Sequence, residues 1–138
     1  MLLINSSPKD AVKIFQSFYP RHPPIGIGYL LSAVEKEGIK AKYIDEQVEH
    51  DVFKLANQYV RELERPYIFG FSVLTAAFKN ALFVSRELKR RYPDSFIVFG
   101  GVHPTLAAEE VLSFAHIDVV IRGEAEASLP QLYRCVKE

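Results

Sequence analysis

The sequence predicts an α/β domain built on a doubly wound, five-stranded parallel sheet. Two observations support this prediction. Short apolar runs alternate along the chain with segments of helical periodicity, and the run at residues 67–73 is apolar on both faces. A strand that is apolar throughout is typical of a parallel sheet with helices on both sides. The length of 138 residues suits one domain, which we assign to residues 1–138.

The first third of the chain contains two predicted strands and one helix. Residues 1–5 form a short apolar strand, and residues 6–24 form a long loop that contains four prolines. A loop of this length in a small domain is usually functional. Apolar residues at helical spacing (Ile27, Leu30, Leu31 and Val34) predict a helix that ends at Gly38. Residues 39–45 are the second predicted strand.

The rest of the chain repeats this alternation. Helical periodicity covers residues 52–63, 78–88, 108–115 and 129–136, and apolar runs at 67–73, 96–99 and 117–122 predict three further strands. Proline residues follow the first two of these helices and stop them. Ser128 and Gln131 have the spacing of a capping box at the start of the last helix.

Five strands that alternate with five helices fit few topologies. Because crossovers between parallel strands are right-handed, the expected arrangement is flavodoxin-like (Rossmann-type), with strand order 2-1-3-4-5. Ligands of such sheets bind beyond the carboxyl ends of the strands, where the order switches between strands one and three. The loops that follow the strands are therefore the place to search for function.

Composition excludes several classes of protein. The chain has 17 basic and 17 acidic side chains, which argues against a general nucleic-acid binder. No apolar run approaches the roughly 20 residues that span a bilayer, so no membrane association is expected. The start of the chain does not have the pattern of a signal peptide, and the single cysteine, Cys135, cannot form an internal disulfide. A cytoplasmic location is expected.

Glycines and hydroxyl groups follow two of the predicted strands. Gly100 and Gly101 end the fourth strand, where the absence of a Cβ leaves room for a ligand. Ser72 and Thr75 follow the third strand, and their hydroxyl groups can bind the polar part of a ligand. The alternative for Thr75 is that it caps the next helix.

Charged and ionisable residues follow the last two strands. His103 is a candidate for a polar contact to a cofactor, or a loop histidine bonded to the backbone. Gly123 and Glu124 follow the fifth strand, and Glu124 has a better claim to function than Glu126, which complements the dipole of the last helix. No second ligand lies at metal spacing from His103, so no metal site is predicted.

Motifs for catalysis are missing from the sequence. It contains neither a Gly-x-Ser-x-Gly elbow nor a Gly-Lys-Ser phosphate loop, and no catalytic residue is proposed. Gly26-Ile27-Gly28 follows two prolines rather than a strand, so it is interpreted as the start of a helix and not as a dinucleotide motif. A flavin-binding domain is disfavoured because the hydroxyl groups after the first strand form a poor phosphate loop. The chain is therefore expected to hold a cofactor without completing a catalytic site.

Five short motifs occur in order at the predicted strand ends, at residues 23–30, 44–45, 70–75, 100–105 and 122–126. Together they resemble the N-terminal cobalamin-binding domain of cobalamin-dependent radical S-adenosylmethionine enzymes, of the methyltransferase and anaerobic magnesium-protoporphyrin monomethyl ester cyclase types. The resemblance covers nearly the whole chain. It implies that the chain binds a corrinoid, with Ser72-Val73-Leu74 and Gly100-Gly101 along the slot for its nucleotide tail. The residues implied as cofactor contacts are Ile25, Gly26, Ser72, Leu74, Thr75, Gly100, Gly101, His103, Gly123 and Glu124.

The chain departs from related cobalamin-binding domains at two points. It lacks the Asp-x-His-x-x-Gly motif that supplies a histidine ligand to cobalt in methionine synthase and the mutases. The resemblance therefore implies base-off cobalamin (the lower base detached from cobalt) without a histidine ligand motif. The lower face of cobalt is then free, bound to water or met by another residue of the long loop. The family's usual Gly-Glu-Gly-Glu reads Gly123-Glu124-Ala125-Glu126 here, and alanine restricts a positive φ at that position.

The radical half of such an enzyme is not in this sequence, because the chain has one cysteine and the radical barrel carries Cys-x-x-x-Cys-x-x-Cys. We expect the chain to be an N-terminal fragment of a longer radical enzyme, a methyltransferase or an oxidative cyclase. The barrel domain in the same chain would then be its partner and would hold an iron–sulfur cluster and S-adenosylmethionine. The alternative is a domain of the same fold that has lost cofactor binding and positions a substrate or partner.

Overall fold

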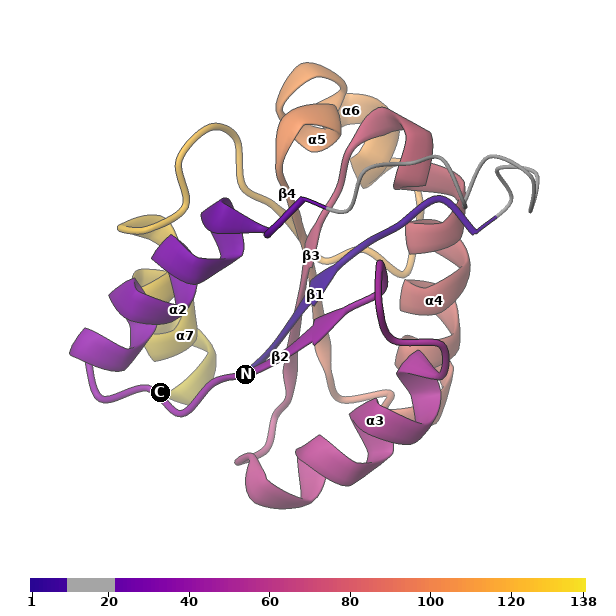
Figure 1. Cartoon of the computed structure of the whole chain (residues 1–138). Helices are drawn as coiled ribbons and strands as arrows, with labels where there is room; N and C mark the ends of the chain where they lie inside the picture. The colour runs from indigo at the N-terminus through magenta and orange to yellow at the C-terminus, as the bar shows by residue number, and fades with distance from the viewer. Residues whose placement is uncertain (10–21) are drawn as a thin grey trace.

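The chain forms a parallel sheet with helices on both faces, as a computed structural model shows for residues 1–9 and 22–138 (Figure 1). Most of the loop predicted over residues 6–24 lies outside the described residues. The strands are β1 (Leu2–Asn5), β2 (Lys42–Asp45), β3 (Ile68–Ser72), β4 (Phe96–Gly100) and β5 (Val119–Val120). The α-helices are α2 (Ile25–Lys36), α3 (Val52–Tyr59), α4 (Phe78–Arg91), α5 (Val102–Leu106), α6 (Ala108–Leu112) and α7 (Ser128–Lys137). The 3-10 helices are η1 (Val60–Glu62) and η2 (Thr75–Ala77).

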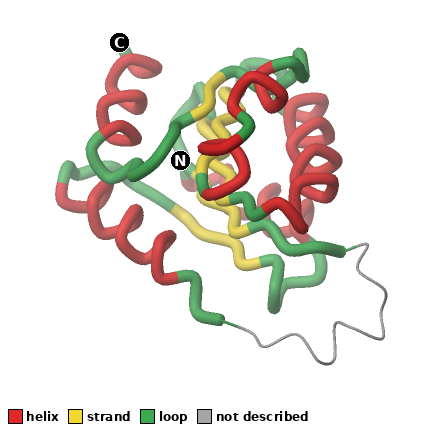
Figure 2. The backbone as a smooth tube through the Cα atoms, turned by 90° about the horizontal axis from the view of Figure 1, so that it is seen from above, coloured by secondary structure: helices red, strands yellow, loops and turns green. Residues whose placement is uncertain are grey.

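The order of the strands is β2-β1-β3-β4-β5, which confirms the predicted order. Each neighbouring pair is parallel, and the register sets Asn5 of β1 beside Ser72 of β3, and Ser72 beside Gly100 of β4. The carboxyl ends of these three central strands therefore lie at one edge. Helices cover the sheet from both sides when it is viewed from above (Figure 2). Among the described residues, no helix combines the length and the apolar character needed to cross a membrane.

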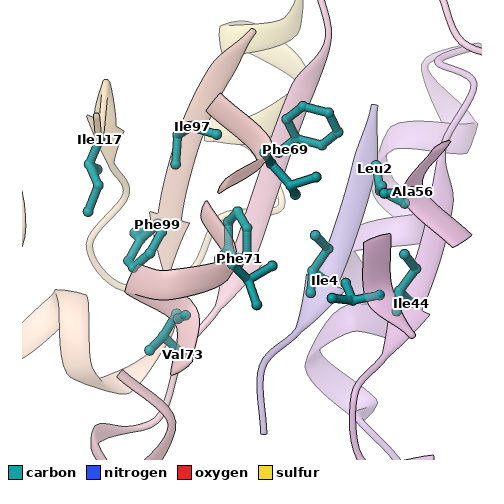
Figure 3. Close-up of a cluster of buried hydrophobic side chains, with 14 of the residues drawn as sticks. Leu2, Ile4, Ile44, Ala56, Phe69, Phe71, Val73, Ile97, Phe99 and Ile117 are labelled. Atoms are coloured by element: carbon teal, nitrogen blue, oxygen red, sulfur yellow. The ribbon is translucent and has the colours of Figure 1, made fainter. Parts of the chain in front are cut away.

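Two hydrophobic cores lie on the two faces of the sheet, because successive side chains of a strand point in opposite directions. The face that packs on α3 and α4 carries large side chains, including Phe69, Phe71 and Phe99 (Figure 3). The rings of Phe71 and Phe99 are 5.1 Å apart between centroids. The face that packs on α2 and α7 is built from smaller side chains, such as Leu3 and Val98. This second face contains the candidate site.

The second strand begins later than the sequence predicts, at Lys42 rather than at residue 39. Gly38 adopts a φ of +72°, and its amide donates to the carbonyl of Glu35 while the amide of Ile39 donates to that of Val34. These two bonds close the end of α2, as in a Schellman motif. Ile39 therefore finishes the helix, although its apolar side chain resembles the start of a strand. The fifth strand is also shorter than predicted, with two residues at the sheet edge.

The predicted capping box at Ser128 is wrong, and the structure does not have the cap that was the alternative for Thr75. Ser128 is the first residue of α7 rather than its cap, and the residue before it, Ala127, makes no capping bond. Thr75 begins η2, and no side chain caps η2 or α4. The sequence also did not predict α5, because Pro104 and the glycines before it suggested a loop. Pro104 is tolerated in the first turn of α5, where a backbone amide has no helical partner.

Candidate functional site

A pocket of about 380 Å³ lies between the sheet and the helices α2 and α7. Its floor comes from the strands, with Leu3 of β1, Gly70 of β3 and Val98 of β4. Ile27 of α2 and Leu129 of α7 line the sides. The pocket therefore lies at the switch between β1 and β3, where the sequence predicted a ligand. Its volume falls within the range of about 300–1,000 Å³ that is typical of small-molecule sites.

Glycines on opposite walls keep the pocket open. A Cβ on Gly70, in the middle of β3, would lie 2.9 Å from Cδ2 of Leu3, so a side chain there would force the buried Leu3 side chain to shift. Gly26 lines the pocket from the first turn of α2, and a Cβ at that position would meet nothing within 4 Å. Glycine at positions 70 and 26 therefore leaves space between the sheet and α2.

Gly101 brings the ends of two strands into close contact. It has a φ of +99°, and a Cβ there would lie 2.9 Å from the backbone nitrogen of Val73. The amide of Val73 donates to the carbonyl of Gly100 at 2.9 Å, and the amide of His103 donates to the carbonyl of Val73 at 3.1 Å. The missing Cβ of Gly101 therefore faces the backbone after β3 and not the pocket. Its role is to allow this close approach of two backbones.

Thr105 connects α5 to the loop after β5. Its Oγ1 donates to the carbonyl of Gly101 at 2.7 Å and accepts from the amide of Gly123 at 2.9 Å. Gly123 has a φ of +70°, which turns the chain after β5. These bonds place residues 123–126 beside the pocket, which they help to line. The charged side chains among the described lining residues are Glu124 and Glu126, and Glu124 is exposed.

Six of the ten residues expected to contact a cofactor line this pocket: Gly26, Ser72, Gly100, Gly101, Gly123 and Glu124. The other four do not line it. The side chains of Ile25 and Leu74 are 67% and 61% exposed. Thr75 and His103 lie together, with 3.3 Å between Oγ1 and Nδ1.

His103 is held away from the pocket by its neighbours. Its ring lies against Phe78, with 4.1 Å between the ring centroids. Its Nε2 is buried and has no hydrogen-bond partner among the described residues. The ring thus takes part in packing between α5 and α4, and its bond to Thr75 joins α5 to η2.

The sequence interpretation missed several residues that shape the pocket. Gly70 is the most important of them, and the signal was present, because a lone glycine inside an apolar strand often marks close approach of a ligand. Val98 and Leu129 gave no signal beyond their apolar periodicity. Thr105 could not be identified either, since its role depends on the position of Gly123.

A second cluster of polar groups lies beyond β1 and β2. Glu46 is buried, and Asn80 of α4 donates from Nδ2 to its Oε2 at 3.0 Å and to the carbonyl of Ser7 at 2.9 Å. Nζ of Lys9 donates to the carbonyl of Glu46 at 3.0 Å. Burial raises the pKa of Glu46 above its ordinary value, against the opposing effects of Asn80 and Lys9. These contacts fix the described start of the loop after β1.

Comparison with known proteins identifies the family of the chain. The profile of the B12 binding domain matches residues 12–133. An uncharacterised methyltransferase of Pyrococcus horikoshii is 32% identical over 80% of this chain and 24% of its own length. The hopanoid C-3 methylase of Methylococcus capsulatus is 28% identical over 94% of this chain and 24% of its own. The anaerobic magnesium-protoporphyrin IX monomethyl ester cyclase of Rubrivivax gelatinosus is 29% identical over 84% and 21%. The chain thus spans about a quarter of these relatives or less.

Solved structures share the fold. The cobalamin-dependent S-adenosylmethionine radical enzyme OxsB, with aqua-cobalamin and S-adenosylmethionine bound, superposes with a TM-score of 0.71 at 23% identity. The match covers 99% of this chain and 18% of OxsB. The radical S-adenosylmethionine methyltransferase TsrM of Kitasatospora setae has a TM-score of 0.73 at 21% identity, over 99% of this chain and 25% of TsrM. At these identities the likeness shows a common fold.

Proposed function

Because the chain belongs to the B12 binding domain family, we propose that it binds cobalamin with the nucleotide tail of the cofactor in the pocket between the sheet and α2. The observation that supports this most directly is the pocket itself. It is lined mostly by apolar side chains, and glycines on both walls leave a space for a flat aromatic base. A domain that had lost cofactor binding would have no need to keep this space open.

The surface around the mouth of the pocket suits the corrin ring. Four apolar side chains that are more than half exposed, which we call the apolar rim, lie in the segments that begin α2, follow β3 and form α5: Ile25, Leu74, Val102 and Leu106. Exposed apolar groups gathered near a pocket usually mark a binding surface. In this proposal Ile25 and Leu74 contact the ring, although they do not line the pocket, and Thr75 and His103 support the loops that carry the rim.

In this proposal, neither an Asp-x-His-x-x-Gly motif nor His103 supplies a ligand to cobalt. No residue of the sequence completes an Asp-x-His-x-x-Gly motif after the first strand. His103 is packed against Phe78 and does not line the pocket. The cofactor is therefore proposed to bind base-off, with its lower base in the pocket rather than on cobalt. The cofactor would supply the methyl-carrying or redox chemistry, and this chain would bind and orient it.

The whole protein is proposed to be a cytoplasmic radical S-adenosylmethionine enzyme, of which residues 1–138 are the N-terminal domain. The relatives named above support this assignment, since each is several times longer than the matched region. The iron–sulfur cluster and S-adenosylmethionine would belong to a barrel domain in the same chain. The reading frame tests this part: a Cys-x-x-x-Cys-x-x-Cys motif after residue 138 is expected, and a frame that ends without one contradicts it.

Cofactor binding is tested by adding hydroxocobalamin to the purified 138-residue chain and separating free cofactor by gel filtration. The expected result is a corrinoid spectrum that elutes with the protein and has the form of base-off cobalamin. A chain that is folded by circular dichroism but retains no corrinoid would contradict the proposal. That result would favour the alternative, in which the domain positions a partner or substrate without cofactor.

A further inference from the structure

The inner part of the pocket is unusually poor in groups that can form hydrogen bonds. Leu3, Ile27, Val98, Ile121 and Leu129 line it, and each of these side chains is at most 9% exposed. The backbones of β1, β3 and β4 at this level are paired in the parallel ladder. Their amide and carbonyl groups are therefore committed to the sheet and do not serve a ligand.

The polar side chains of the pocket are few, and most are unsuited to a buried base. The hydroxyl of Thr105 is already used as donor to Gly101 and acceptor from Gly123. Glu124 and Glu126 belong to the loop after β5, and Glu124 is exposed. Ser72 remains, and its half-buried side chain makes no hydrogen bond within the part of the chain that the structure describes. Among the described residues that line the pocket, Ser72 thus offers the one hydroxyl side chain without a partner, beside an apolar inner surface.

We infer that this pocket selects corrinoids by the chemistry of the lower base, and that it takes a benzimidazole in preference to a purine. The inference rests on the proposed function. A detached benzimidazole has one free ring nitrogen, which the one hydroxyl of Ser72 can satisfy, and its methyl groups and benzene ring gain from apolar burial. A detached adenine has three free ring nitrogens and an amino group. Most of these would be buried without partners, which costs affinity.

The test compares three corrinoids on the 138-residue chain: cobalamin, its adenine-containing analogue, and cobinamide, which has no lower base. All are used as dicyano forms, because the base of each is then already detached from cobalt and detachment does not enter the comparison. Dissociation constants come from isothermal titration calorimetry. We expect cobalamin to bind at least about tenfold more tightly than either of the others, the scale of one unpaired buried polar group.

The outcomes separate this inference from the proposed function. Equal affinity for cobalamin and the adenine analogue, with both tighter than cobinamide, would overturn the selectivity while the tail pocket stands. Equal affinity for all three would show that the base does not enter the pocket, and this result would also overturn the selectivity. Binding of none of them by folded protein would contradict the proposed function itself.

A pair of variants assigns the selectivity to the pocket wall. Val98→Thr adds a hydroxyl to the pocket with almost no change in volume, and should lower the ratio of cobalamin affinity to adenine-analogue affinity several-fold. Val34→Thr adds a hydroxyl to the same buried core, but Val34 does not line the pocket, so the ratio should not change. Because both ligands are measured on the same protein, lost stability cancels in the ratio. An unchanged ratio in Val98→Thr would overturn the assignment.

Discussion

Gly101 shows how a single residue determines the shape of the sheet edge. Its φ of +99° and ψ of −166° belong to a region that essentially only glycine occupies. The position of its missing Cβ faces the backbone of Val73, at 2.9 Å from the nitrogen. Gly123 also has a positive φ, of +70°, but a Cβ there would meet nothing within 4 Å. The two glycines are thus required for different reasons.

Gly101→Ala should lower the free energy of unfolding by about 2–4 kcal/mol, because backbone strain and a steric conflict with Val73 add together. Gly123→Ala should cost only about 1–2 kcal/mol, since strain acts alone. Urea denaturation of both variants measures the difference. Equal losses would mean that the close approach to Val73 is not maintained in solution.

Glu46 is a buried carboxyl group whose pKa is higher in the folded state than its ordinary value. Burial raises its pKa, so the folded protein holds this proton at pH values where the unfolded chain has released it. Stability from this group is therefore complete below the ordinary pKa of 4.5 and is lost as pH rises through the folded value.

Glu46→Gln should remove this pH dependence, because glutamine keeps an acceptor for Asn80 and carries no charge. The unfolding free energy of the variant should exceed that of the wild type near neutral pH, and the difference should vanish toward about pH 4. Denaturant titrations at a series of pH values provide the measurement. A difference that grows as the pH falls would contradict a raised pKa of Glu46 in the folded state.

At the scale of elements, α2 lines one wall of the pocket, and two of its glycines allow a matched comparison of substitutions. Gly26 and Gly28 both lie in the first turns of α2, and at both positions a Cβ would meet open space. Only Gly26 lines the pocket. A large side chain at Gly26 therefore fills the proposed cofactor space, whereas at Gly28 it does not.

Gly26→Phe should weaken cobalamin binding at least about tenfold, and Gly28→Phe should leave it close to that of the wild type. Both changes replace glycine inside a helix, so neither should lower helix stability. Spectroscopic titration with hydroxocobalamin, at matched protein concentrations, gives the affinities. Comparable affinity of the two variants would exclude the space beside Gly26 as the binding site.

The connection between α5 and the loop after β5 depends on one hydroxyl group. Thr105→Val keeps the shape of the side chain but removes the bonds to Gly101 and Gly123, which should cost about 1–2 kcal/mol of stability. It should also weaken cobalamin binding, since residues 123–126 are released from the pocket wall. Thr75→Val is the control for the loss of stability, because the bond of its side chain to His103 is exposed and 3.3 Å long. A loss as large in the control would show that Thr105 has no special role.

Sequence patterns predicted the elements well and their ends less well, for physical reasons. The strands and their order followed from apolar runs and handedness, which are properties of whole segments. The predicted start of β2 was wrong because the amide of Ile39 donates to the carbonyl of Val34 at the end of α2. A pattern of side chains does not show where a backbone amide donates. The sequence predicted a ligand site at the carboxyl ends of the strands, and the pocket lies at that edge of the sheet. Thr105 remained hidden because its partners are distant in sequence.

At the scale of the whole molecule, the two faces of the sheet have different tasks. The side facing α3 and α4 is filled by Phe69, Phe71 and Phe99 (Figure 3). The opposite side of the same strands carries Gly70 and Val98, and there the helices α2 and α7 enclose a pocket beside the second, smaller-residue core. Side chains alternate between the two faces along β3 and β4. One face can therefore carry the large aromatic side chains that stabilise the fold, while the other face leaves room for the pocket.

A crystal structure of this chain with cobalamin tests the central claim most directly, because it locates the lower base. We expect the base to be detached from cobalt and enclosed between β1, β3 and α2, beside Gly70 and Gly26, with the corrin ring on the apolar rim. Cobalamin bound with its base still on cobalt, or with the base in solvent and the pocket empty, would contradict the claim.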